Sequence, residues 1–247
     1  MIRPLALLAA LAPQPGAAQD APCERTSFDG APYTVCRIPA GSDVRLFLND
    51  EGGMRLGGFS TVEAALAADG ERLVLGMNAG MYHPDRSPVG LYVEEGAEAT
   101  RLVTAAGPGN FGMKPNGVLC LSDGAASILT TEAFAADPPA CDFATQSGPM
   151  LLIGGELHPR FIPGSDSLNV RNGAGVAPNG DLVLAISEAP VNFHSFARLF
   201  RDAYDVDDAL YLDGRVSRLW VPSEGRRTGG LPLGPMIGLV EPGAASD

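Results

Sequence analysis

The chain has 247 residues and carries 17 Lys and Arg against 29 Asp and Glu, so its net charge is -12 at pH 7. This balance argues against nucleic acid or an anionic membrane surface as a partner, and we interpret the acidity as a solubility feature. The length allows one large domain or two small ones, each with a proper core.

The N-terminus has the pattern of a secretory signal peptide. A short basic start ending at Arg3 is followed by an apolar run from Pro4 to Ala12 and by the small pair Ala17-Ala18. We predict a signal peptide over residues 1–18, cut after Ala18, and a periplasmic or secreted mature protein. The run is too short to span a bilayer, which takes roughly 20 apolar residues, and no later stretch approaches that length. We therefore expect no membrane span.

Four cysteines in an exported chain predict two disulfides. Four cysteines allow three connectivities, and the spacing favours neighbours, Cys23 with Cys36 and Cys120 with Cys141. Neither these cysteines nor the three histidines have the close spacing of zinc ligands, so we predict no metal site.

Short apolar or alternating runs recur along the chain, separated by turns rich in its 31 glycines and 21 prolines. Their lengths are typical of strands. The predicted strands are Tyr33 to Ile38, Val44 to Leu48, Leu73 to Met77, Gly90 to Glu94, Val118 to Leu121, Ser127 to Thr130, Met150 to Ile153, Leu182 to Ile186 and Ala209 to Leu212. No linker or repeat divides them. We expect one α+β domain over residues 19–247, dominated by mixed or antiparallel sheet and with few helices.

Two helices and one hairpin are predicted between these strands. Residues 60–63, Ser-Thr-Val-Glu, have the capping-box pattern ahead of a helix over 64–68. Apolar residues from Phe196 to Ala203 repeat at helical spacing. Pro178-Asn179-Gly180 predicts a turn that closes a hairpin between residues 175–177 and 181–187.

The first candidate site residues lie in the loops of the N-terminal two thirds. Asn78 follows an apolar strand and can orient a sugar hydroxyl or satisfy its own turn, while His83 can be an acid or base or a solvated loop residue. Lys114, Gln146 and Ser147 lie beside predicted strands. A nucleophilic Ser147 has no identifiable base, and the Gly-x-Ser-x-Gly pattern is absent.

Two later segments combine arginine with amide, hydroxyl or carboxylate groups. Arg171 and Asn172 lie in a glycine-containing strand, and Asp213 ends an apolar strand shortly before Ser217 and Arg218. The arginines suit bidentate binding of phosphate, or alternatively a salt bridge with Asp166 or Asp213.

Two carboxylates are candidate catalytic groups. Burial would raise the pKa of Asp213, nearby arginines would lower it, and its structural alternative is to cap the turn at Gly214. Glu188, after another strand, is either a second cleft carboxylate or an exposed loop residue.

Glycine-rich stretches lack the Walker and dinucleotide spacings, so we expect neither a nucleotide nor another cofactor. A metal-dependent phosphodiesterase would need a cluster of carboxylates and histidines, and the sequence offers none.

From about Leu73 to Gly238, the chain resembles the phosphodiester glycosidase family, the group that contains the catalytic domain of the mannose 6-phosphate uncovering enzyme. Residues 78–82, Asn-Ala-Gly-Met-Tyr, resemble its Asn-Gly-Gly-Phe-Phe turn, and residues 171–175 resemble its Arg-Thr-Ala-x-Gly strand. Residues 212–214 begin like its Leu-Asp-Gly-Gly-Gly-Ser-Ser motif, but Arg-Val-Ser-Arg follows at 215–218. The chain looks closer to an uncharacterised bacterial exported branch.

The resemblance implies hydrolysis of a sugar 1-phosphodiester in envelope glycans or lipids, with cleavage of the glycosidic bond. It assigns Arg171 and Arg218 to the phosphodiester, Asp213 to the anomeric carbon, and Asn78 and Asn172 to orientation of the substrate. The alternative is a non-catalytic periplasmic protein that binds glycans or takes part in envelope assembly.

Overall fold

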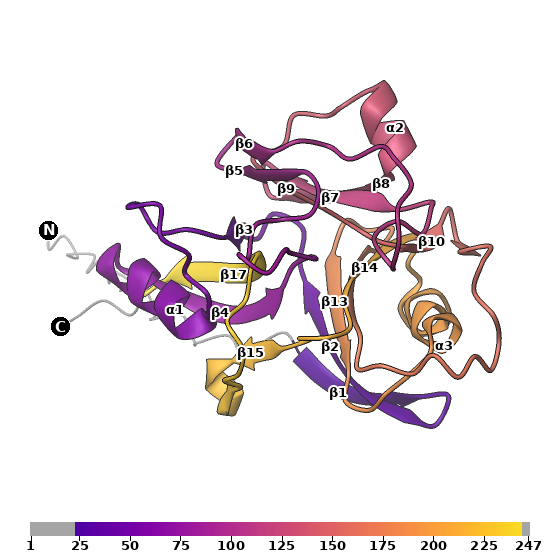
Figure 1. The fold of residues 1–247 in the computed structure, drawn as a ribbon. Coiled ribbons are helices and arrows are strands. Elements are labelled where there is room, and N and C mark those ends of the chain that lie inside the picture. Colours follow the sequence, from indigo (N-terminus) through magenta and orange to yellow (C-terminus); the bar gives the residue numbers. More distant parts are fainter. Residues whose placement is uncertain (1–22, 244–247) are drawn as a thin grey trace, which may run out of the picture.

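Residues 23–243 are described by a computed structural model, in which three β-sheets pack around a shared apolar core (Figure 1). Every strand pair in this part of the chain is antiparallel. The predicted fold class, one α+β domain dominated by sheet, is confirmed. The predicted signal peptide, residues 1–18, lies outside the described residues.

Each sheet combines strands from distant parts of the chain. The seven-stranded sheet has the order β1 (Cys23–Phe28), β2 (Ala31–Ile38), β13 (Leu182–Ser187), β12 (Asn172–Val176), β14 (Asp208–Asp213), β10 (Met150–Ile153), β11 (Glu156–Leu157). The β4 sheet has the order β16 (Arg226–Arg227), β15 (Leu219–Val221), β4 (Glu71–Asn78), β17 (Met236–Pro242), β3 (Val44–Phe47). The β7 sheet has the order β6 (Ala97–Thr100), β5 (Tyr92–Glu94), β9 (Phe143–Ser147), β7 (Gly117–Ser122), β8 (Ala125–Thr130).

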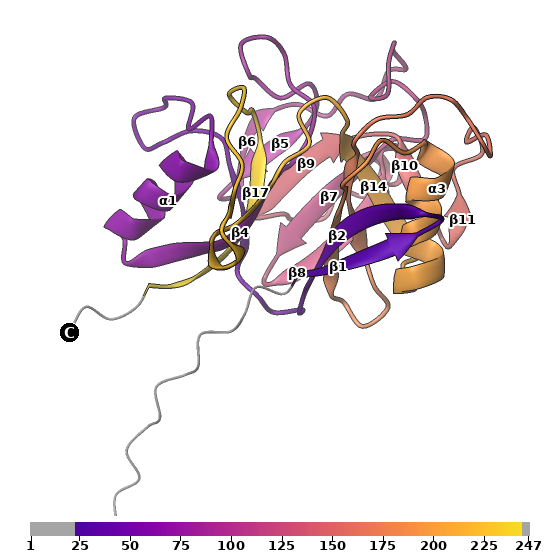
Figure 2. The same ribbon diagram turned by 90° about the horizontal axis from the view of Figure 1, so that it is seen from below.

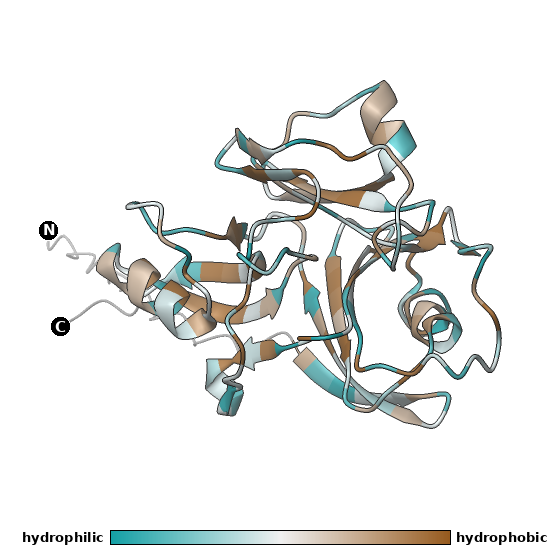
Figure 3. Cartoon of the chain, viewed as in Figure 1, coloured by the Kyte–Doolittle hydropathy of each residue, from teal (hydrophilic) through white to brown (hydrophobic). Residues whose placement is uncertain are grey.

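The central strands of the seven-stranded sheet are apolar on both faces. In β14, Leu210 and Leu212 enter the core shared by the three sheets, whereas Ala209 and Tyr211 pack in a second core on the other face. Side chains alternate between the faces of a strand, so two buried faces require a continuous apolar run. Figure 3 shows these apolar strands in brown.

Each sheet has a helix packed against it. Helix α1 (Phe59–Ala68) buries Phe59, Val62 and Leu66 against the β4 sheet. The predicted capping box is wrong, because the helix begins at Phe59 and its N-cap, Gly58, makes no side-chain bond. Helix α2 (Thr131–Ala136) was not predicted and is capped by the side chain of Thr130.

The predicted helix over Phe196 to Ala203 is confirmed as the second half of a longer element. Helix α3 (Phe193–Arg198) continues into a π-helical turn, η1 (Leu199–Ala203), and both pack on the seven-stranded sheet. Figure 2 shows the β1–β2 hairpin close to α3, and Arg198 of α3 pairs with Asp29 of the hairpin turn at 2.7 Å.

The predicted hairpin around Pro178-Asn179-Gly180 is also confirmed. Strands β12 and β13 pair from Asn172 and Ile186 to Val176 and Leu182. Ala177 N donates to Asp181 O at 3.0 Å and closes the turn. The hairpin sets the register that places Asn172 at the start of β12, between Ile186 of β13 and Asp213 of β14.

Both predicted disulfides are present, Cys23–Cys36 and Cys120–Cys141. The first joins directly paired residues of β1 and β2, and the second joins β7 to the segment before β9. We expect replacement of either pair by serine to lower the free energy of unfolding by about 2 to 4 kcal/mol, because the unfolded chain regains loop entropy. Urea denaturation of the two variants measures this, and unchanged midpoints would contradict it.

Glu94 of β5 is a half-buried carboxylate that joins two sheets. Its Oε1 accepts a hydrogen bond from Leu48 N at 3.2 Å, beside the end of β3, and burial raises its pKa to about 6. A carboxyl whose pKa is higher in the folded state than in the unfolded state contributes its full stabilisation at pH values below the unfolded-state pKa. That contribution is lost as the pH rises through the folded-state pKa, which is about 6 for Glu94.

We therefore expect Glu94→Gln to stabilise the protein at pH 8 relative to wild type, and to lose this advantage at pH 4. The gain should be up to about 1 kcal/mol, below the full shift because solvent still screens the carboxylate. Thermal melting at both pH values tests this, with Glu98→Gln on exposed strand β6 as the control. A variant that is destabilised equally at both pH values would contradict the expectation.

Candidate functional site

Three of the predicted site residues meet where the β4 sheet adjoins the seven-stranded sheet. Strand β4 ends at Asn78, β12 begins at Asn172, and β14 ends at Asp213. Asn172 is the cross-strand partner of Asp213, and its Nδ2 donates to Asn78 O at 2.8 Å and Asn78 Oδ1 at 3.2 Å. We call Asn78, Asn172, Asp213, Ser217 and Arg218 the junction cluster.

The turn after Asp213 carries the chain from one sheet to the other and completes this cluster (Figure 1). Arg218 N donates to Asn78 Oδ1 at 2.8 Å. Ser217 Oγ lies 3.0 Å from Asp213 O and 3.4 Å from Asn172 Oδ1. Residues up to 140 positions apart therefore share one hydrogen-bond network.

Asp213 is held by its own turn and is only 7 % exposed. Its Oδ1 accepts from Arg215 N at 2.6 Å and from Val216 N at 3.4 Å, as the structural alternative of a turn cap predicts. Burial raises the pKa of this carboxyl, while the backbone amides of the turn and the charge of Arg215 act in the opposite direction. The Asp213 carboxylate is held through Oδ1 and is largely shielded from solvent. A carboxylate in this state suits direct interaction with a positive charge that develops during a reaction.

Asn78 supplies an unused donor within the junction cluster. Its Oδ1 accepts two hydrogen bonds, but its buried Nδ2 has no partner among the described residues. Buried amides are normally satisfied, so this group can donate to a ligand oxygen or a water molecule.

Tyr82 is a residue of the site that the sequence analysis did not assign. Its pKa is raised first by burial and then by the charge of Asp213, while Arg218 and Arg86 lower it. Its hydroxyl donates to Pro232 O at 3.2 Å. The signal was present in the sequence, because Tyr82 ends the Asn-Ala-Gly-Met-Tyr turn. His83, the candidate that follows this turn, is exposed to solvent.

Three arginines lie near Asp213 or the adjacent Tyr82 in an acidic protein. Arg86 and Arg218 act on Tyr82, and Arg215 acts on Asp213. Within residues 23–243, none of these three arginines forms an ion pair with a carboxylate. Arg218 donates one hydrogen bond from Nη2, to Leu231 O at 2.5 Å. Its remaining donors are available to an anion.

Lys114, Gln146 and Ser147 are engaged in structural contacts. Gln146 Oε1 accepts from Leu91 N and Val103 N, and its Nε2 donates to Val103 O and Thr131 Oγ1. Buried Ser147 donates to Leu212 O at 3.1 Å, and Lys114 donates to Thr104 O. These placements do not support the predicted contacts of the three residues with substrate.

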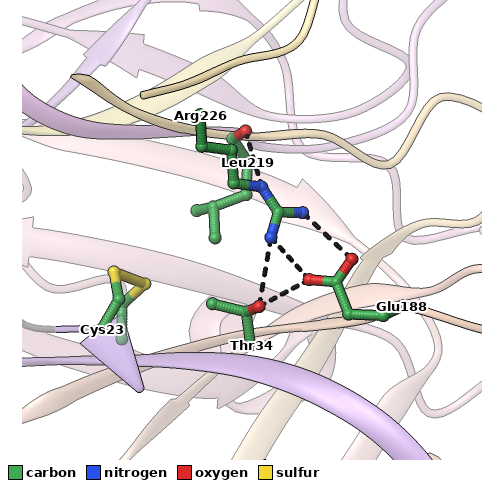
Figure 4. Close-up of a disulfide and its surroundings, with 6 residues drawn as sticks. Cys23, Thr34, Glu188, Leu219 and Arg226 are labelled. Atoms are coloured by element: carbon green, nitrogen blue, oxygen red, sulfur yellow. Dashed lines mark hydrogen bonds and ion pairs between the residues drawn. A yellow bond between two sulfur atoms is a disulfide. The ribbon is translucent and has the colours of Figure 1, made fainter. Parts of the chain in front are cut away.

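Glu188 was predicted as a second catalytic carboxylate, and the structure places it in an ion pair with Arg226 at 2.5 Å (Figure 4). Its Oε1 also accepts from Thr34 Oγ1 at 2.5 Å. Thr34 and Asp213 occupy the same row of the sheet, separated by β13 and β12, which is roughly 14 Å at the usual strand spacing. Glu188 is therefore not a partner of Asp213.

Arg171 was predicted to bind the phosphodiester, but its side chain is 0 % exposed. It donates to the backbone oxygens of Val191 and Ser167, each at 2.8 Å, and pairs with neither Asp166 nor Asp213. The guanidinium already donates to these two backbone oxygens and stacks on the Phe193 ring, so this placement does not support a contact with the phosphodiester. The role in phosphodiester binding that the family resemblance implies for Arg171 is therefore not supported.

A pocket of about 300 Å³ lies elsewhere, beyond the ends of β2 and β7, and contains none of these site residues. Its lining includes residues 38–44 and 121–126. No group of three or more potential metal ligands occurs among the described residues. In the same part of the chain, no helix is long and apolar enough to cross a bilayer.

Known proteins resemble this chain in sequence and in fold. The uncharacterized protein YigE of Escherichia coli (strain K12) is 33 % identical over 189 residues, which cover 76 % of this chain and 73 % of YigE.

Two solved structures share the fold, each with a TM-score of 0.57 and 14 % identity, and at this identity they show the fold alone. One is the zebrafish N-acetylglucosamine-1-phosphodiester α-N-acetylglucosaminidase catalytic domain, auto-inhibited by its pro-peptide, with 88 % of this chain and 81 % of that one covered. The other is a proposed exported protein of Burkholderia pseudomallei K96243, with 85 % and 74 % covered.

The family model for phosphodiester glycosidase matches residues 71–233, which include every member of the junction cluster. The chain therefore belongs to the phosphodiester glycosidase family.

Proposed function

We propose that this protein is an exported hydrolase that cleaves the glycosidic bond of a sugar 1-phosphodiester in envelope glycans or lipids. The observation that carries the proposal is the buried Asp213 carboxylate, with Arg215 on its own turn and with Arg86 and Arg218 near the adjacent Tyr82, in a chain of net charge -12. None of the three arginines has a carboxylate partner among the described residues. Two disulfides and the predicted signal peptide support a periplasmic or secreted location.

In this mechanism, Arg218 binds the phosphodiester, with Arg215 and Arg86 adding positive charge, and Asn78 Nδ2 donates to a substrate oxygen. Asp213 stabilises the positive charge that develops at the anomeric carbon. The bond between this carbon and the phosphate oxygen breaks, water adds its oxygen to the sugar, and a phosphomonoester leaves with the electron pair. Phosphate is a good leaving group, so one carboxylate with arginines can support a reaction that often uses two carboxylates.

The decisive experiment locates the bond that breaks. The protein is incubated with a sugar 1-phosphodiester in H₂¹⁸O, and both products are examined by mass spectrometry. Label in the sugar supports the proposal, whereas label in the phosphate would show a phosphodiesterase. Tight binding of the substrate without turnover by any of a panel of sugars would favour the glycan-binding alternative.

Arg218→Ala should lower kcat/KM by roughly 10- to 100-fold, mainly through KM, because a charge-assisted contact with the phosphate is lost. Steady-state kinetics measures this, with Arg227→Ala as a matched control, since Arg227 is an exposed arginine of neighbouring strand β16. Equal kinetics for the Arg218 variant and wild type would remove Arg218 from the phosphate site.

A further inference from the structure

Arg171 is a fully buried cation without a carboxylate partner in the described part of the chain. Its Cζ lies 3.6 Å from the centre of the Phe193 ring and 5.4 Å from that of Tyr211. Nε and Nη2 donate to backbone oxygens, but Nη1 has no partner there. Burial of a charge is costly unless other groups compensate, and here two carbonyls and two aromatic faces provide the compensation.

These contacts connect Arg171 to the turn that holds Asp213. The Tyr211 hydroxyl lies directly against Gly214, where any Cβ would overlap it. On another side, Asn169 Cβ would lie 3.5 Å from such a Cβ, and Asn169 follows the Ser167-Leu168 segment that Arg171 holds through Ser167 O. Arg171 therefore supports both neighbours of Gly214.

Tyr211 lies near both charged groups, Arg171 and Asp213. Burial raises the pKa of Tyr211 to about 12, the positive charge of Arg171 lowers it, and the negative charge of Asp213 raises it. The charges of Arg171 and Asp213 therefore act on the Tyr211 hydroxyl in opposite directions. The other groups that face Asp213 are Arg215 of its own turn and Tyr82 of the loop after β4.

We propose that Arg171 is a positioning residue that fixes the Asp213-Gly214 turn through Tyr211, without contacting the phosphate. The catalytic meaning of this role rests on the proposed function. The contacts themselves do not, so the role can be tested separately from activity.

The test compares wild type with Arg171→Met, Arg171→Lys and Tyr211→Phe in the full-length mature protein. The Asp213 carboxyl is titrated by ¹³C NMR, with Asp213→Asn used for assignment, and binding of inorganic phosphate is measured by calorimetry. The turn amides of Arg215 and Val216 lower the Asp213 pKa, and they should shift when the turn loses its support. We therefore expect Arg171→Met to raise the Asp213 pKa and leave the Kd for phosphate within roughly twofold, while kcat falls roughly 10- to 100-fold with little change in KM.

The other two variants separate charge from geometry. Arg171→Lys keeps the cation but cannot donate to both carbonyls through a planar guanidinium, so the Asp213 pKa should rise in this variant as well, while kcat falls. Tyr211→Phe should give an intermediate shift in the Asp213 titration. Thermal melting establishes that each variant is folded, and if Arg171→Met is not, the Lys and Phe variants still decide.

A tenfold weaker Kd for phosphate in a folded Arg171 variant would make Arg171 a phosphate ligand and overturn the inference. An unchanged Asp213 titration in folded Arg171→Met would also overturn it. If wild type hydrolyses no sugar phosphodiester, the proposed function fails, while the titration still decides the role of Arg171.

Discussion

Asp213→Asn should lower kcat by roughly 10³-fold or more while it largely preserves substrate binding. Asparagine keeps an oxygen that can accept from the amides of Arg215 and Val216, so the turn should remain in place. The negative charge next to the anomeric carbon is lost, and the interaction that strengthens in the transition state disappears with it. Kinetics with a sugar 1-phosphodiester, together with calorimetric binding of the same substrate, measures both effects.

Asp166→Asn is the matched control, because Asp166 is an exposed acid on the loop before β12. It should retain wild-type kinetics. Full activity in a folded Asp213→Asn variant would remove Asp213 from the mechanism.

Gly214→Ala should have the second large effect, although it adds a single methyl group. The new Cβ would overlap the Tyr211 hydroxyl, so the turn or the tyrosine must move. We expect a loss of stability of about 1 to 3 kcal/mol, as for other overpacked sites, and a fall in kcat of roughly 100-fold because Asp213 moves with the turn. Thermal melting and kinetics measure the two losses.

A double variant tests the cause. Tyr211→Phe removes the hydroxyl that the added methyl group would meet, and the ring carbon Cζ would then lie 3.3 Å from the new Cβ, a tight but tolerable contact. Adding Tyr211→Phe should therefore restore part of the stability lost in Gly214→Ala. Strictly additive losses would show that the hydroxyl is not the obstacle.

Strands with two buried faces could be predicted from the sequence, since β13 and β14 are continuous apolar runs between turn signals. Strand β9 was missed because Thr145, Gln146 and Ser147 read as polar loop residues. These side chains are buried, and hydrogen bonds to distant backbone groups satisfy them. Those partners exist only in the folded chain, so no local pattern reveals the strand.

Part of the candidate site could also be predicted from the sequence. Asn78, Asn172 and Asp213 are polar residues at strand ends, and strand ends adjoin in sheets. The sequence could not separate Arg171 from Arg218, because that requires knowing which arginine faces a core of aromatic rings. Tyr82 and Arg86 were missed because their roles depend on which loop packs against Asp213.

The hydrogen bonds between Asn78 and Asn172 join two different sheets, so they exist only while those sheets are docked. A ligand held by the junction cluster binds this docked state and has no counterpart in separated sheets. Ligand binding then raises the free energy of unfolding of the whole domain, and does not merely stabilise one loop. Bound substrate would therefore protect the protein against unfolding and proteolysis. The ligand-free protein would be the form that proteases degrade fastest.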